Sequence, residues 1–157
     1  MGTDRFDFLR NQYSAYEIKS SQDGNALKIV NPFGGESIIV EYVPDDEYTP
    51  FIVYFAFQHC HMNDEENILE YINDIIAGKI FSIEFFNQGN LCFGGDITIE
   101  DLQHLSYDFL VNHWGFSELL DRADAFKVRG WRCSDNLDAI FVTDENGQKA
   151  IQILPYK

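Results

Sequence analysis

The densest group of reactive side chains is the tripeptide His59-Cys60-His61. On a β-strand alternate side chains point to the same side, so His59 and His61 would lie together while Cys60 faces the core. Two imidazoles on one side could bind a transition metal, with a third ligand from the acidic residues at 64–66. A metal site needs three or four fixed ligands, however, and the other two histidines lie elsewhere. We therefore favour a structural role for this pair and keep metal binding as the alternative.

A second candidate is the segment Cys92-Phe93-Gly94-Gly95-Asp96, which precedes a predicted helix. A helix N-terminus lowers the pKa of a thiol, so Cys92 could act as a nucleophile with His59 or His61 as its base. The spacing matches no catalytic motif, and the apolar neighbours of Cys92 favour its burial as a small apolar residue. We expect Gly94-Gly95 to end the strand.

Acidic residues outnumber basic ones along most of the chain. Its 157 residues include 26 Asp and Glu against 11 Lys and Arg, for a net charge of −15. Between Ile29 and Asp121 there are 17 acidic residues and a single basic one, Lys79. Such a surface either keeps a Phe-rich protein soluble or attracts a basic partner. The partner-binding residues that we predict form two short acidic runs: Asp45, Asp46 and Glu47, and Asp64, Glu65 and Glu66.

The charge of the chain and its cysteine content limit which partners and which cellular compartment we expect. A strongly acidic chain repels the phosphates of nucleic acids, so we expect no direct nucleic-acid binding. The longest apolar run, Phe51–Phe57, has seven residues and is too short to cross a membrane. Three widely spaced cysteines match neither a disulfide framework nor a paired metal motif, which favours a reducing, cytoplasmic setting. No cofactor motif is present, and we expect no cofactor.

The elements that must position these side chains follow from the hydrophobic pattern. Strand-like segments arrive in consecutive hairpins, with turn residues at 87–90 and 144–147. Phe51–Phe57 is apolar throughout and is expected to be a central strand. The clearest helix begins at Asn63 and stops at Gly78. A second helix is expected to start at Thr98 and a third near Ser117.

Two further expectations depend on these elements. The second helix would carry both His104 and His113 on opposite sides, so they could not share a metal. Near the C-terminus Lys127, Arg129 and Trp131 would lie on one face of a strand, with Trp131 in the core and the bases on a solvated edge.

Together these patterns predict a single α+β domain over residues 1–157. We expect a mostly antiparallel sheet of about six to eight strands built from hairpins, with two to four helices packed on one face.

Three classes of function remain open. The first, which we prefer, is a small acidic intracellular protein that binds a basic partner and has no catalytic activity. By size, charge and the lack of catalytic motifs it resembles small acidic immunity proteins that neutralise basic toxins, and the resemblance implies a basic toxin as partner. The second is a metal- or Cys-dependent enzyme centred on His59, His61 and Cys92. The third is a structural subunit that self-associates into a homo-oligomer through its C-terminal strands.

Overall fold

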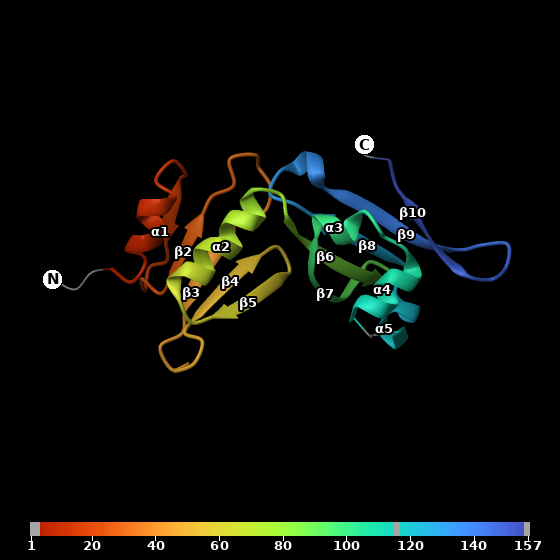
Figure 1. The fold of residues 1–157 in the computed structure, drawn as a ribbon, viewed down its shortest axis with the longest axis horizontal. Helices are drawn as coiled ribbons and strands as arrows, with labels where there is room; N and C mark the ends of the chain where they lie inside the picture. Colours follow the sequence, from red (N-terminus) through yellow and green to blue (C-terminus); the bar gives the residue numbers. More distant parts are fainter. Residues whose placement is uncertain (1–3, 115–116, 156–157) are drawn as a thin grey trace.

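The α+β class with antiparallel strands is confirmed by the computed structural model, which describes residues 4–114 and 117–155 (Figure 1). In this part of the chain ten strands form two sheets of five, where we expected one sheet of about six to eight. Sheet A has the order β1 (Ile18–Ser20), β2 (Ala26–Ile29), β3 (Ile38–Tyr42), β4 (Phe51–Phe55), β5 (Gln58–Met62). Sheet B has the order β10 (Lys149–Ile153), β9 (Leu137–Thr143), β8 (Ala125–Arg129), β6 (Ile80–Asn87), β7 (Asn90–Thr98).

Sheet A is a meander of hairpins that buries one face. Side chains alternate along β4, so that Phe51, Val53 and Phe55 face the core while the residues between them face away. Helices α1 (Asp7–Gln12) and α2 (Glu65–Ile76) cover this buried face, and both contribute to one apolar cluster. The apolar run Phe51–Phe57, which we expected to form one strand, is broken by a turn at residues 56–57. Strand β5 begins directly after this turn.

Sheet B buries one face beneath three short helices. These are α3 (Ile99–Leu102), α4 (Tyr107–Trp114) and α5 (Ser117–Arg122), and a 3₁₀ turn, Cys133–Asp135, follows β8. Thr98 caps α3 as predicted, because its side chain accepts a hydrogen bond from the Asp101 amide at 3.2 Å. The helix then stops, and the Ser106 hydroxyl accepts the amide of Phe109 at the start of α4. Our expectation of one helix carrying both His104 and His113 is therefore wrong.

The buried indole of Trp131 joins the two sheets. Trp131 follows β8 of sheet B, yet its side chain is 1% exposed within the apolar cluster of sheet A. There it makes edge contacts with Tyr16, at 5.9 Å between ring centroids, and it also lies beside Phe55. The buried Asn31 side chain donates to the Trp131 carbonyl at 2.7 Å. The predicted core position of Trp131 is thus confirmed, although that core belongs to the other sheet.

A second junction lies where the β4–β5 turn meets strand β7. Phe57 of the turn packs against Gly94, where an added Cβ would come within 2.5 Å of its ring. Glu84 stands opposite Gly94 in the β6–β7 register, and burial raises the pKa of its carboxyl while the charge of Arg129 lowers it in part. Strand β7 runs through to Thr98, so Gly94-Gly95 does not end it. A glycine is needed at position 94 because another chain segment passes over it.

The basic residues Lys127 and Arg129 lie inside sheet B. Strand β8 is paired on both sides, by β6 and β9, so the expectation that these bases occupy an edge is wrong. Arg129 forms an ion pair with Asp138 of β9 at 2.7 Å, and Lys127 stands opposite the same residue in the strand register. Arg129 is thus paired with an acid within the sheet, whereas the exposed Lys127 places its ammonium over the Phe86 ring.

Candidate binding groove beside strand β5

The two acidic runs lie at the same end of sheet A. Residues 45–47 belong to the loop between β3 and β4, and residues 64–66 begin α2. Because Phe51 at the start of β4 pairs with Met62 at the end of β5, the loop and the first turn of α2 meet at one end of the sheet (Figure 1). The structure thus brings together the two runs that we predicted as partner-binding residues.

Two of these six carboxylates hold local structure. Asp46 accepts hydrogen bonds from the Thr49 amide and hydroxyl and from the Tyr48 amide, at 2.9–3.0 Å. These bonds hold the pKa of the Asp46 carboxyl below its usual value, the Thr49 amide contributing most. Asp64 caps α2 by accepting the Asn67 amide at 2.8 Å, one residue after the Asn63 cap that we predicted. Asp45, Glu47, Glu65 and Glu66 are exposed.

We expect Asp64→Ala to lower the free energy of unfolding by about 1 kcal/mol, because the substitution removes the N-cap of α2. Asp64→Asn keeps an oxygen for the Asn67 amide and removes only the charge, so it should cost less. Urea denaturation of the three proteins measures the difference. Equal losses in both variants would show that charge, and not capping, is what Asp64 contributes.

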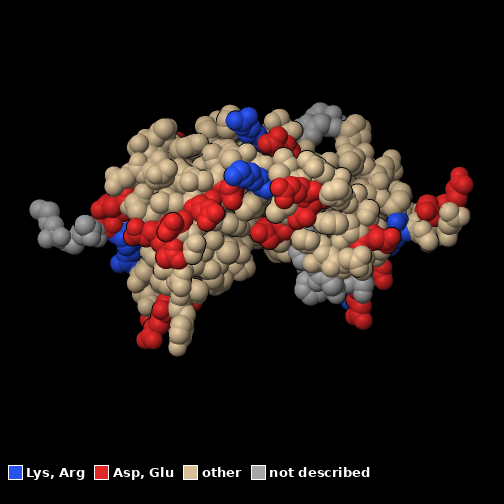
Figure 2. Space-filling model, in the orientation of Figure 1, with Lys and Arg blue, Asp and Glu red and all other residues tan. Residues whose placement is uncertain are grey.

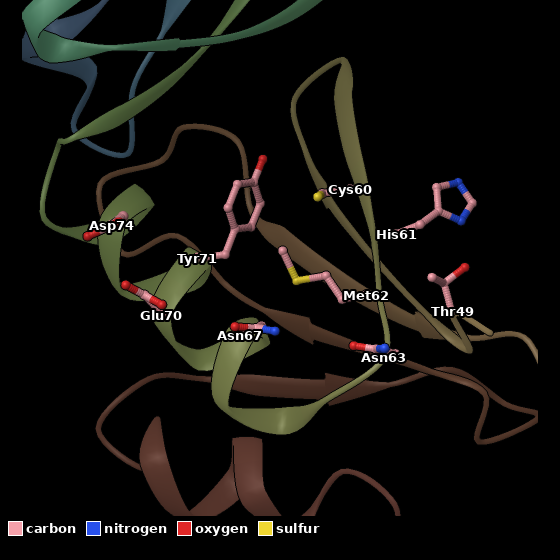
Figure 3. Close-up of a pocket in the computed structure, with 9 residues that line it drawn as sticks. All are labelled: Thr49, Cys60, His61, Met62, Asn63, Asn67, Glu70, Tyr71 and Asp74. Carbon is pink, nitrogen blue, oxygen red and sulfur yellow. The ribbon is translucent and has the colours of Figure 1, made fainter.

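A groove of about 420 Å³ separates strand β5 from helix α2 (Figure 3). Its lining residues come from β5, from α2 and from the segments that flank them: Thr49, Cys60, His61, Met62, Asn63, Asn67, Glu70, Tyr71 and Asp74. Cys60, Met62 and Tyr71 extend between the strand and the helix, whereas His61 points to the other side of the strand. The groove therefore has an apolar floor and a polar rim.

Tyr71 lies at the centre of this groove. Its phenol extends into the space between α2 and the β4–β5 hairpin (Figure 3). Burial raises the pKa of the hydroxyl, and the neighbouring Asp96 and Cys60 add to the rise, so Tyr71 stays protonated at neutral pH. Within residues 4–114 and 117–155 its hydroxyl forms no hydrogen bond. Tyr71 thus offers a donor to whatever occupies the groove.

The groove continues toward sheet B. A smaller pocket of about 180 Å³ shares Cys60 and Tyr71 with it and is closed by Gly94, Gly95 and Asp96 of β7. Burial and the nearby Asp96 raise the pKa of the Cys60 thiol, which makes it a poor nucleophile at neutral pH. This chemistry suits binding better than covalent catalysis.

His59 and His61 lie together as predicted, on the solvent side of β5. Their ring centroids are 5.4 Å apart and both residues are exposed. In the described part of the chain, no group of three or more His, Cys, Asp and Glu side chains is placed to hold a metal ion. The pair therefore supplies at most two ligands there.

Cys92 lies apart from the histidines. Strand β7 has a register shift opposite Phe85 and Phe86 that leaves Cys92 without a partner in the ladder, as in a β-bulge. The bulge exposes Cys92, so our expectation that it is buried is wrong. Among the described residues, neither pocket that includes His59 or His61 also includes Cys92.

Comparisons with known proteins leave the groove as the main guide to function. Neither the protein-family models, nor the curated proteins, nor the solved structures contain a match to this chain. None of the helices in the described segments is long and apolar enough to cross a membrane.

The prediction from sequence did not include Glu70, Tyr71 or the open edge of β5. A signal for the helix side was present, since Asn67, Glu70, Tyr71 and Asp74 recur at separations of three and four and so form a polar stripe beside the apolar one. The strand side had no comparable signal, because strand order decides which strand lies at an edge.

Proposed function

We propose that this chain is a protein-binding protein without catalytic activity, and that the outward side of α2 captures a basic partner. The observation that carries the proposal is the group Glu65, Glu66 and Glu70, which α2 holds exposed beside the groove. In the described structure these three carboxylates form no ion pair. Figure 2 shows Asp and Glu atoms in a band across this face, with few Lys and Arg atoms among them.

The electrostatics of α2 favour association with a cation. The helix has no Lys or Arg, and the nearest base along the chain, Lys79, is paired with Asp74 at 3.1 Å. Unpaired charges of one sign on a rigid helix steer an oppositely charged partner and reject partners of the same sign. The interaction must weaken as salt rises, because exposed charges are screened over ~8–10 Å at physiological ionic strength.

A basic toxin is the kind of partner that the proposal favours, with this chain acting as an immunity-type protein. Enclosing cationic side chains in the acidic face would prevent the toxin from contacting its own anionic target. The free thiols of Cys60, Cys92 and Cys133 are compatible with a reducing cytoplasm, which we propose as the compartment.

The triple variant Glu65→Gln, Glu66→Gln, Glu70→Gln tests this proposal. We expect it to fold normally and to bind the basic partner about tenfold more weakly, because each exposed charge contributes a few tenths of a kcal/mol. The partner is captured from a lysate of the source cells, purified and titrated by calorimetry at several salt concentrations.

A matched control removes the same charge from other regions. The variant Glu100→Gln, Glu118→Gln, Glu145→Gln changes exposed acids near sheet B and should bind as the native protein does. Equal weakening in both triple variants would mean that only net charge matters, and salt-independent binding would exclude the electrostatic mechanism. Either result would overturn the proposed role of α2.

A further inference from the structure

We propose that the partner enters the groove as an extended basic segment and pairs with the free edge of β5, adding a sixth strand to sheet A. This inference rests on the proposed function and specifies what the acidic face recognises. Strand addition draws affinity from main-chain hydrogen bonds and specificity from alternate side chains.

Strand β5 has backbone groups available for such pairing. Of the strands in the described residues it is the last of sheet A, and β4 is its single pairing partner there. The turn at residues 56–57 closes on a Phe55–Gln58 pair, so alternation directs the N–H and C=O groups of His59 and His61 away from β4. Among the described residues, His59 and His61 form no backbone hydrogen bond with any other element.

The first residues of β5 lie beside Gly94, Gly95 and Asp96 of β7 across the smaller pocket, and the rest of the β5 edge lacks the features that usually protect an edge strand. Exposed edges are commonly blocked by Lys, Pro or a bulge, and the sequence Gln-His-Cys-His-Met contains none of these. The other free edges differ. β1 has three residues and carries Lys19, β10 begins with Lys149, and β7 is crossed at Gly94 by the β4–β5 turn.

The groove beside this edge can receive the side chains of an added strand. Along such a strand, alternate residues would face inward onto Met62 and Tyr71 or outward beside His59 and His61. A Lys or Arg facing inward can pack its aliphatic stem on the apolar floor and place its charge near Glu70. The Tyr71 hydroxyl is available to donate to a carbonyl of the same segment.

The charge of α2 favours a basic segment over a second copy of this chain as the occupant of the groove. Pairing β5 with β5 of another molecule would bring two α2 helices, each with Glu65, Glu66 and Glu70, toward one interface. Like charges placed together cost stability, whereas Lys and Arg side chains in the groove would offset them. The favoured occupant is therefore a cationic strand from another protein.

Two synthetic peptides test whether the backbone is recognised. The first alternates Lys and Val, and the second has the same side chains with every backbone amide N-methylated, so that charge is kept while strand pairing is blocked. We expect the unmethylated peptide to bind at low salt and the methylated one to bind at least about tenfold more weakly. Calorimetry measures both, and sedimentation of the unliganded protein shows whether β5 pairs with a second copy.

Variants of the full chain separate the inference from the proposed function. His61→Pro removes one outward N–H and should weaken the unmethylated peptide about tenfold, whereas His61→Ala, which keeps that N–H, should not. If the two peptides bind the native protein equally well and the α2 triple variant binds neither, strand addition is overturned, while the acidic face is kept as the binding surface. If methylation weakens binding but the triple variant binds the unmethylated peptide as the native protein does, the charge proposal is overturned instead. Absence of binding by either peptide, or a stable dimer through β5, would overturn the strand-addition inference.

Discussion

Replacing Trp131 with Ala is expected to lower the free energy of unfolding by about 3–5 kcal/mol. The indole is 1% exposed and belongs to the apolar cluster of sheet A, although its backbone continues from sheet B. Its removal would leave a cavity between Tyr16 and Phe55, which both lie beside the ring. Sheet A would also lose the large side chain that sheet B inserts into it. Urea denaturation followed by far-ultraviolet circular dichroism measures the loss.

Trp131→Phe provides the matched control. Phenylalanine retains most of the apolar contact, and it removes an indole N–H that is buried without a hydrogen-bond partner in the described structure. We therefore expect a loss of about 1 kcal/mol. Tyr48→Ala, at a residue that is 84% exposed, should change stability by less than about 0.5 kcal/mol. A similarly small effect of Trp131→Ala would show that the indole does not hold the sheets together.

Gly94→Ala is expected to lower stability by about 3 kcal/mol, because the new methyl group has no space. Its Cβ would lie 2.5 Å from the Ile83 carbonyl oxygen and 2.5 Å from the Phe57 ring. A backbone oxygen in a paired strand cannot move far, so strand β7 or the β4–β5 turn must shift. Thermal and urea denaturation measure the cost.

The double variant Gly94→Ala, Phe57→Ala separates the two contacts. Removing the Phe57 ring relieves one clash and leaves the contact with the Ile83 oxygen, so the double variant should recover about 1 kcal/mol relative to Gly94→Ala. Phe57→Ala by itself should cost little, since Phe57 is 42% exposed. Strictly additive losses would mean that the turn does not press on strand β7.

Local elements were largely predictable because their signals lie in neighbouring residues. The stop of α2 at Gly78 and the turn at 87–90 are confirmed, with positive φ at Gly78, Gln88 and Gly89. Errors arose where a local signal was ambiguous. The run 51–57 contained a hairpin turn at Ala56, a residue type that rarely adopts the φ of 52° observed there. Adjacent glycines at 94–95 resembled a strand end, because the need for glycine at position 94 depends on the Phe57 ring, which packs on it from the distant β4–β5 turn.

The candidate site was predictable only in part. The acidic runs could be identified by composition, and they do lie at one end of sheet A. The hydrogen bonds that these acidic residues accept could not be predicted, because the bonds from Thr49 to Asp46 depend on the conformation of a loop. Exposure of Cys92 was also unpredictable, since a bulge in β7 depends on its pairing with β6.

The sequence by itself determined the α+β class, the hairpins, the cap and stop signals of the helices and the acidic character of the chain, because each follows from residue type and short spacing. Only the tertiary structure decided that the strands divide into two sheets, that Trp131 crosses between them and that β5 ends as a free edge beside α2. Strand order and inter-sheet packing result from contacts between residues far apart in the chain, and no local pattern encodes which strand is left without a neighbour.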